Sequence, residues 1–255
     1  MLSAPLVKGR YVVRFSRDAA DVARAQHLRW QAFRAPRGGA AAAAAGGRDA
    51  DSHDRRCLHV LIEEACSGAL ACCFRLMALA DGRAIPKSYS ARFYDLSGLS
   101  RYGAPMAEIG RFCIRPGLHD PDILRIAWGA ITRHVDDNGV GLLFGCSSFR
   151  GTDWRAHAEA FAALAQGHAA PPQWLPRAKA PEIVDFAPLR AGQACDPKRA
   201  MAAMPPLLRS YLAMGGWVGD HAVVDRDLGT LHVFTGLEIR AIPPGRARLL
   251  RAIGA

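Results

Sequence analysis

The order of apolar and polar positions predicts a β-α unit early in the chain. Apolar and polar residues alternate over residues 11–15, which is typical of a half-buried strand. Asp18 is a suitable helix N-cap. Apolar residues then recur at spacings of three and four, at Val22, Ala25, Leu28 and Ala32. We therefore expect a strand followed by a helix that ends near Phe33.

Two apolar runs, "CLHVLIEE" (57–64) and "GALACCFRLMAL" (68–79), predict a hairpin in the middle of a sheet. A polar connection follows, and "AEIGRFCIRP" then reads as a strand closed by Pro116. Asp120 and Pro121 have the residue types of an N-cap and a first helical position, and Gly139 is a stop signal. The inner face of this helix is expected at Ile123, Ala127, Ala130, Ile131 and His134.

The rest of the chain continues the alternation of strands and helices. "VGLLFGCSSF" (140–149) predicts a central strand, and helices are expected from 153 to about 166 and over 205–215. Two further strands are expected around "HAVVD" and "TLHVF". Together these elements predict an α/β fold with a mixed central sheet and helices on both faces. A chain of this length and composition fits one domain over residues 1–255.

Two segments have a different composition. Six alanines between paired glycines dominate residues 36–50, and so short a stretch cannot offset helix nucleation, so we expect a mobile loop. Residues 240–255 carry four arginines and no acid, so they form a basic tail. This tail is suited either to an anionic membrane surface or simply to solvent.

Charge and cysteine content indicate the compartment and the partners. The net charge of +10 implies an acidic partner, and nucleic acid is disfavoured because no zinc finger, RNP motif or long basic run is present. No apolar run reaches the ~20 residues of a membrane span. Charges at Lys8, Arg10 and Arg14 argue against a secretory signal, and seven cysteines without a CxxC motif fit reduced thiols. We expect a cytoplasmic protein, with peripheral contact at the inner membrane face as a further option.

The common catalytic motifs are absent from the sequence. It has no Walker motif, no GxGxxG after a strand, no HExxH and no GxSxG. No Cys and His spacing suggests zinc, so no metal and no bound cofactor are expected. The sequence therefore disfavours enzymes that use a nucleophilic side chain or a bound metal ion for catalysis.

The strand and helix around "MAEIGRFCIRPGLHDPDILRIAWGAI" resemble the core of the GNAT superfamily, whose members transfer an acyl group from a pantetheine thioester to an amine. Members that use coenzyme A carry an [RQ]xxGx[GA] turn that grips its pyrophosphate. This chain has "RPGLHDPD" there, and Asp120 and Asp122 would repel phosphates. Free coenzyme A is therefore a poor candidate for the acyl donor.

The first 115 residues also resemble the acyl-homoserine-lactone synthases. The pattern of that family is matched by Arg29, Phe33, Asp51, Asp54, Arg75, Glu108, Arg111 and Phe112. Where those synthases have a tryptophan after the phenylalanine, this chain has "APRGG".

Seven further segments occur in order along nearly the whole chain: "AQHLRWQAF", "DSHDRRCLHVLI", "YDLSGL", "EIGRFCIRP", "LRIAWGAITRHV", "LLFGCSSFRGTD" and "PPLLRSYLAMGGWVGDHAVVD". Together they resemble the signatures of the L-ornithine N-alpha-acyltransferases. This resemblance implies transfer of a (3-hydroxy)fatty acyl group from acyl carrier protein to the α-amine of L-ornithine. Lactone synthesis from S-adenosylmethionine and a non-enzymatic basic membrane-binding module are the alternatives.

The chemistry requires a base, because an α-ammonium group is not a nucleophile. Glu108 is the only acid in "AEIGRF" and is the expected base, directly or through water; a salt bridge to Arg111 or Arg75 is the structural alternative. Arg111 would orient that carboxylate or contact the donor. Backbone N–H groups near Cys113 and Ile114 are expected to polarise the thioester carbonyl.

Other residues are expected to hold substrate or carrier. Asp51 and Asp54 suit the amino-acid cation, and Arg29 or Arg75 suits its carboxylate; solvated loop acids are the alternative for the aspartates. Phe33 belongs to the same matched pattern, and Trp128 and Phe144 would line an acyl tunnel or simply pack in the core. The expected carrier-docking residues are Arg150, Arg155, Lys198, Arg199 and Arg209, with solvated side chains as the alternative.

Overall fold

The computed structural model describes residues 5–38, 47–192 and 196–254. The chain divides into two compact units. Unit 1 comprises residues 1–78, 109–139 and 244–255, and unit 2 comprises residues 79–108 and 140–243. Strand β6 (Met106–Ile114) gives its first three residues to unit 2 and the remainder to unit 1.

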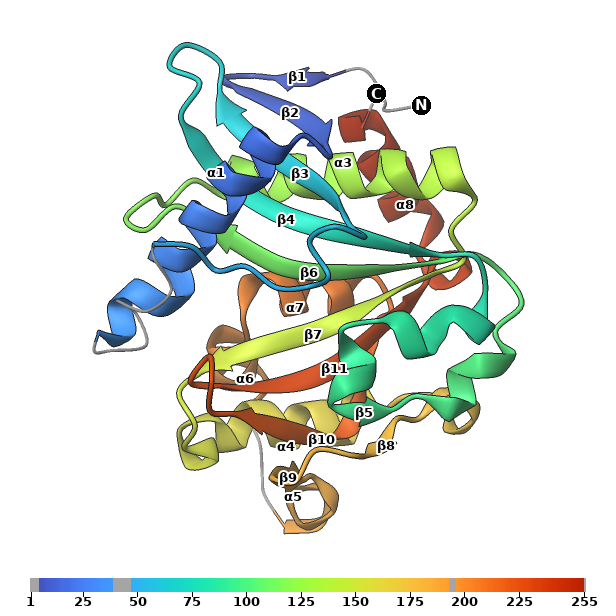
Figure 1. Cartoon of the computed structure of the whole chain (residues 1–255). Coiled ribbons are helices and arrows are strands. Elements are labelled where there is room, and N and C mark those ends of the chain that lie inside the picture. Colours follow the sequence, from blue (N-terminus) through green and yellow to red (C-terminus); the bar gives the residue numbers. More distant parts are fainter. Residues whose placement is uncertain (1–4, 39–46, 193–195, 255) are drawn as a thin grey trace. The chain divides into compact units, whose positions relative to one another are not determined.

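Unit 1 is a sheet with helices on both faces (Figure 1). Its strands lie in the order β1 (Leu6–Lys8), β2 (Tyr11–Ser16), β3 (Leu58–Glu64), β4 (Leu70–Leu79) and β6, and the first four pair antiparallel. Helix α1 (Ala19–Arg29) covers one face, and α3 (Pro121–Asn138) and α8 (Pro244–Gly254) cover the other. This confirms the predicted strand-helix order in the first third of the chain.

Local signals set the ends of α1 and α3. The Asp18 side chain accepts hydrogen bonds from the backbone N–H groups of Ala20 and Asp21. Asp120 caps α3 by accepting from the N–H of Asp122, and Gly139 ends it in the left-handed conformation. The predicted inner face of α3 is buried. One detail of α1 differs from the prediction: after Arg29 the chain widens into a π-helix over Trp30–Arg34, which carries Phe33.

Helix α8 packs closely against α3, because glycines lie at their crossing. A Cβ atom on Gly129 would come within 2.6 Å of Ile253 Cγ2, and one on Gly254 would come within 2.7 Å of the Gly129 carbonyl oxygen. Arg133 donates to the Gly254 carbonyl, and Arg251 forms an ion pair with Asp136 at 2.9 Å. The described part of the predicted basic tail is therefore mainly a docked helix, preceded by a short turn (Ile239–Ala241), and Ala255 lies outside the described residues.

Unit 2 holds four strands in the order β7 (Leu142–Arg150), β11 (Thr230–Glu238), β10 (Trp217–Asp225) and β9 (Ile183–Asp185), and neighbouring strands pair antiparallel. A small sheet pairs β5 (Tyr94–Asp95) with β8 (Arg177–Ala178). Helices α4 (Ala158–Gly167), α5 (Ala187–Gly192), α6 (Pro197–Ala203) and α7 (Pro206–Ala213) complete it. Its core includes Phe149, Phe161, Phe186 and Leu208.

The connection between β4 and β6 contains 3₁₀ turns at Gly82–Lys87, Ser90–Arg92 and Ser97–Arg101. Other short 3₁₀ turns lie elsewhere in the chain, at Ala35–Arg37, Trp154–His157 and Pro172–Trp174. The loop expected over residues 36–50 falls largely on residues 39–46, which lie outside the described residues. Across the described ranges, no helix combines the length and the apolar character that are needed to cross a bilayer.

Candidate active site

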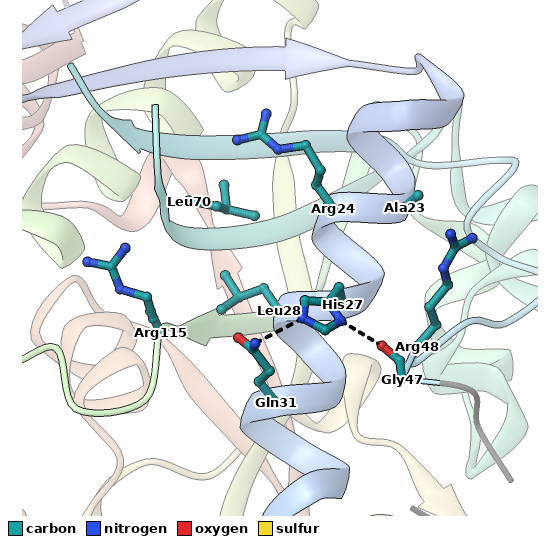
Figure 2. Close-up of a pocket in the computed structure, with 9 residues that line it drawn as sticks. All are labelled: Ala23, Arg24, His27, Leu28, Gln31, Gly47, Arg48, Leu70 and Arg115. Atoms are coloured by element: carbon teal, nitrogen blue, oxygen red, sulfur yellow. Dashed lines mark hydrogen bonds between the residues drawn. The ribbon is translucent and has the colours of Figure 1, made fainter. Parts of the chain in front are cut away.

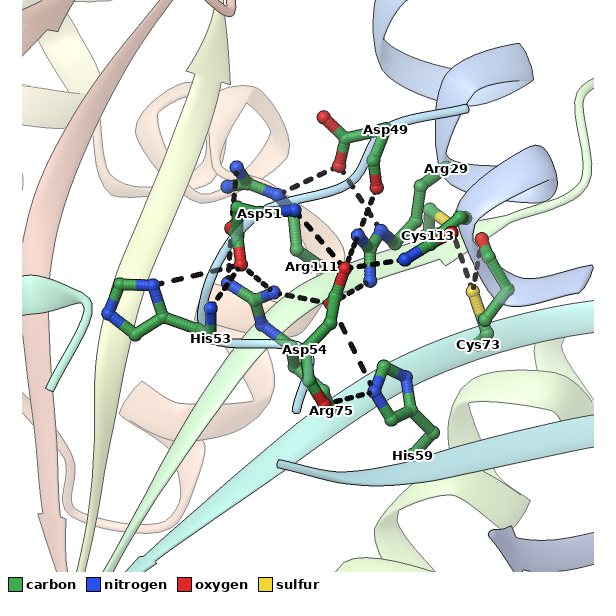
Figure 3. A network of polar contacts seen from close by, with 12 residues as sticks. Arg29, Asp49, Asp51, His53, Asp54, His59, Cys73, Arg75, Arg111 and Cys113 are labelled. Atoms are coloured by element: carbon green, nitrogen blue, oxygen red, sulfur yellow. Dashed lines mark hydrogen bonds and ion pairs between the residues drawn. The ribbon is translucent and has the colours of Figure 1, made fainter. Parts of the chain in front are cut away.

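A buried ion network in unit 1 brings together most of the residues that the sequence pattern singled out (Figure 3). Arg29, the last residue of α1, is 1% exposed. It binds both carboxylate oxygens of Asp54 at 2.8 and 3.0 Å, and its Nε donates to Asp49 Oδ2 at 3.1 Å. Its Nη2 also donates to the Asp49 carbonyl oxygen. The end of α1 is thereby tied to the segment that precedes β3.

Arg75 extends the network from strand β4. Its Nη1 donates to Asp54 Oδ1 and to Asp51 Oδ1, both at 2.7 Å, and its Nη2 donates to Asp51 Oδ2 at 2.8 Å. Asp54 also accepts from the Gln26 side chain at 2.9 Å and from the Asp51 N–H at 3.2 Å. Both oxygens of Asp54 are therefore engaged by protein donors, whereas Asp51 sits at the rim of the network.

Arg111 enters the network from β6 with an unusual backbone. Its φ of 54° places it in the left-handed region, the one non-glycine residue there among the described residues. Such a conformation costs about 1–2 kcal/mol and is typical of functional sites. Its Nε donates to Asp49 Oδ2 at 3.0 Å, and its Nη2 lies 3.4 Å from Asp51 Oδ2. This left-handed residue lies two positions before Cys113, near which backbone N–H groups were expected to polarise the thioester carbonyl.

Asp49 joins three separate segments. Besides Arg29 and Arg111, it binds Arg34 of the π-helix, whose Nε donates to Oδ1 at 2.8 Å. The wide π turn lets a residue five positions after Arg29 reach the same carboxylate. The sequence pattern missed Asp49 and Arg34. The only signal was the recurrence of acids in "GGRDADSHD", which does not identify their partners.

The electrostatics of the network favour ionised carboxylates. Burial alone would raise the pKa of Asp54, but the hydrogen bonds and charge of Arg29, with Gln26 and Arg75, hold it well below the usual range. The pKa values of Asp49 and Asp51 are lowered in the same way, against burial, by arginines that include Arg111. Burial lowers the pKa of His59, whose Nε2 lies 3.0 Å from the Asp54 carbonyl oxygen. The network therefore persists across the neutral pH range.

Glu108 belongs to unit 2 and is 4% exposed. Its carboxylate accepts from the N–H groups of Tyr89 and Ser90, both at 2.7 Å, and from Ser90 Oγ at 2.6 Å. Ser90 Oγ in turn lies 3.4 Å from Cys146 Sγ. These donors all come from two neighbouring residues, Tyr89 and Ser90. Glu108 thus fixes the turn at Ser90–Arg92 and holds a defined orientation.

Several other predicted residues lie in apolar surroundings. Phe33 packs against a cluster that contains Leu28, Cys73 and Cys113, and the two sulfur atoms lie 3.6 Å apart. Trp128 is buried in α3 of unit 1. Phe144 is buried in unit 2, stacked on Phe234 at 5.8 Å between ring centroids. Ile114 is half-buried.

The five cations expected to dock a carrier protein all belong to unit 2. Arg155 lies over the Trp154 ring, and Arg199 forms an ion pair with Glu159 at 3.2 Å. Arg150 and Lys198 are exposed, and Arg209 is partly buried.

A groove of about 490 Å³ lies beside α1 in unit 1 (Figure 2). Leu28 and Leu70 contribute apolar surface, and Arg24, Arg48 and Arg115 are its charged lining residues, with no acid among them. Two of these arginines are already paired, Arg24 with Glu63 and Arg115 with Glu64. None of the residues predicted for the site lines this groove.

Comparison with known proteins defines the class. The family model for the acetyltransferase (GNAT) domain matches residues 28–129, a segment that contains all of the ion network. A solved N-acyl amino acid synthase from uncultured soil microbes aligns over 93% of both chains with a TM-score of 0.46 and 9% identity. The family-model match confirms the predicted GNAT-like α/β fold.

Sequence relatives identify the particular family. An L-ornithine N(alpha)-acyltransferase of Rhodobacter capsulatus is 31% identical over 249 residues, covering 95% of this chain and 94% of the relative. One of Rhizobium meliloti is 32% identical over 238 residues, covering 90% and 80%. The chain belongs to the L-ornithine N(alpha)-acyltransferase family, so the protein is an N-acyltransferase.

Proposed function

We propose that this protein transfers a (3-hydroxy)fatty acyl group from an acyl carrier protein to the α-amine of L-ornithine, which forms a lyso-ornithine lipid. Family membership over nearly the whole chain carries this proposal. The ion network supports it, since it combines carboxylates and guanidinium groups that match the charges of an amino acid.

The N-terminus of α3 supports an acyl carrier protein, rather than coenzyme A, as the acyl donor. The N–H of Asp122, which a phosphate would need, already bonds the Asp120 carboxylate at 2.9 Å, and that carboxylate also accepts from Tyr11 at 2.7 Å. A second acid, Asp122, lies in the first helical turn. Asp120 is paired with Arg10 and Asp122 with Arg125, so the occupied N–H group, rather than a net negative charge, disfavours the nucleotide of coenzyme A here. An acidic carrier protein would instead engage the exposed cations of unit 2, with its phosphopantetheine as the donor arm.

The reaction needs proton removal and a polarised carbonyl. In the proposed mechanism, Glu108 accepts the α-ammonium proton, directly or through water, and the free amine attacks the thioester carbonyl. Backbone N–H groups beyond the left-handed Arg111, near Cys113 and Ile114, stabilise the oxyanion. The tetrahedral intermediate then expels the pantetheine thiolate, which takes up the remaining proton of the attacking nitrogen, and Glu108 releases its proton to water. The products are the amide and the free pantetheine thiol.

The proposed setting is the cytoplasm, with peripheral contact at anionic membrane. Helix α8 supports this contact: Arg246, Arg248 and Leu249 are exposed on it, and Leu249 is 68% exposed. Co-sedimentation with vesicles that contain phosphatidylglycerol, compared with phosphatidylcholine alone, tests it.

The proposed activity is tested by incubating the protein with 3-hydroxyacyl carrier protein and either L-ornithine or S-adenosylmethionine, followed by mass spectrometry. We expect acyl-ornithine. A lactone product from S-adenosylmethionine without acyl-ornithine would replace the proposal with lactone synthesis.

A further inference from the structure

The contact between Asp51 and Arg111 is the loosest link of the buried network. Its 3.4 Å distance exceeds the 2.7–3.1 Å of the other arginine-carboxylate hydrogen bonds at Asp49, Asp51 and Asp54. The side chains of Asp51 and Arg111 are 16% and 9% exposed, against 4% or less for Arg29, Arg75 and Asp54. Arg34 is 18% exposed, but Asp49 holds it at 2.8 Å, so Asp51 and Arg111 form the most weakly bonded pair that an approaching ligand can reach.

Both residues stay anchored if this contact opens. Arg75 holds both oxygens of Asp51, at 2.7 and 2.8 Å, and Asp49 holds Arg111 through Nε at 3.0 Å. Neither charge would be left without a protein partner, so the opening avoids the large cost of an isolated buried charge. Opening this contact would release Arg111 Nη2 and one lone pair of Asp51 Oδ2 for the ligand, while Asp51 Oδ1 stays bonded to Arg75 and to the His53 N–H at 2.9 Å.

The chemistry of the acceptor limits what can bind there. The α-amine must lose its proton and reach the thioester, so it cannot be held in an ion pair. A diamino acid then has two charged groups left for recognition, its carboxylate and its side-chain ammonium. Guanidinium suits the carboxylate, and a carboxylate suits the ammonium.

We propose that Arg111 binds the carboxylate of the amino-acid acceptor and that Asp51 binds its side-chain ammonium, which makes this pair the determinant of diamino-acid specificity. The inference rests on the proposed function, which it deepens. It differs from the sequence-based expectation, in which Asp54 shared the cation and Arg29 or Arg75 took the carboxylate. Those three groups are buried against one another and serve to hold Asp51 in place.

The role of Asp51 is tested by comparing two substrates in the wild-type protein and in an Asp51 variant. L-norvaline has the carbon skeleton of ornithine without the side-chain amine. We expect the wild type to favour ornithine over norvaline in kcat/KM, and Asp51→Asn to reduce this preference at least 10-fold, or about 1.4 kcal/mol. The control is Asp21→Asn, which breaks another arginine pair of unit 1 and should leave the preference unchanged.

A second variant remains informative if Asp51→Asn folds poorly. Asp51→Glu keeps the charge and lengthens the side chain by one methylene, so it should shift the preference from ornithine towards 2,4-diaminobutyrate, which is one methylene shorter. For Arg111, Arg111→Lys should weaken discrimination between ornithine and 1,4-diaminobutane, which lacks the carboxylate. Thermal melting checks that each variant is folded.

The outcomes separate this inference from the proposed function. If no amino acid is acylated by the wild type, the proposed function fails. If ornithine is acylated but folded Asp51→Asn and Asp51→Glu keep the wild-type preferences, the assignment of Asp51 is wrong while the activity stands.

Discussion

Arg111 keeps a left-handed backbone inside strand β6 while its Nε donates to Asp49 Oδ2 at 3.0 Å. The two features are linked, because a non-glycine residue holds such a conformation only when its surroundings compensate for the strain. Asp49 supplies that compensation and connects Arg111 to Arg29 and Arg34. The buried carboxylate thus couples the end of α1 to the irregularity in the strand.

Replacing Asp49 should therefore be costly. Asp49→Asn leaves three arginines around a neutral amide, and we expect the free energy of unfolding to fall by about 3 kcal/mol or more. Urea titration monitored by circular dichroism measures this change. Asp122→Asn, in an exposed pair with Arg125, is the matched control and should change stability by no more than about 1 kcal/mol. Equal effects of the two variants would contradict a central role for Asp49.

The role of Glu108 can be separated from its structural contacts. Glu108→Gln should lower kcat by ~10²-fold or more if the carboxylate accepts a proton. Ser90→Ala removes one of the three donors and keeps the carboxylate, so it should cost about 1 kcal/mol of stability and largely retain kcat. Steady-state kinetics of both variants measures the two kcat values and distinguishes a catalytic role of Glu108 from a structural one. Similar losses of kcat in both would mean that Glu108 acts by holding the turn at Ser90–Arg92.

Acid should remove the contribution of Asp21 to stability. Hydrogen bonds from Arg14 lower the pKa of Asp21 to about 2. Because this folded-state pKa lies below that of an unfolded carboxyl group, the pair stabilises the fold fully above about pH 4 and loses its effect as pH falls towards 2. Asp21→Asn should thus lower the free energy of unfolding by about 1 kcal/mol at pH 7 and by almost nothing near pH 2. Urea titrations over this range test the prediction, and a difference that is independent of pH would contradict it.

The donor preference should depend on salt. We expect kcat/KM with acyl carrier protein to exceed that with the matching acyl-coenzyme A by at least ~10-fold at low salt, and the gap to narrow as salt screens the protein surfaces. Combining Arg150→Glu with Arg155→Glu should remove most of the advantage without changing the coenzyme reaction. Kinetics with both donors across a salt series measures this. Equal efficiencies at low salt would indicate that the nucleotide is held elsewhere.

The sequence predicted best the helices and strands whose bounds are set by residues within or next to them, such as helix caps and long apolar runs. Helix α3 begins at its Asp-Pro pair and ends at Gly139, because capping and left-handed glycine act within a few residues. Strands β3, β4 and β7 are long apolar runs and also lie close to their predicted bounds. The two-residue strands β5 and β8 were missed, since so short a segment has no period to detect.

The site was predictable in its members but not in its pairing. Arg29, Asp51, Asp54, Arg75 and Arg111 were all singled out, and the structure brings them together in unit 1. Which aspartate faces which arginine depends on how α1, β4 and β6 pack, and the sequence does not encode that locally. Asp49 and Arg34 were missed for the same reason, because their roles arise from a π turn and a left-handed residue.

The glycine crossing of α3 and α8 also constrains how this family can vary. A side chain at position 129 would overlap the Ile253 side chain, although 124 positions separate the two along the chain. A relative with alanine at the first position must accommodate it with a smaller residue at the second or with a displaced helix. The two positions should therefore change together across related sequences, as a covarying pair whose cause is steric rather than catalytic.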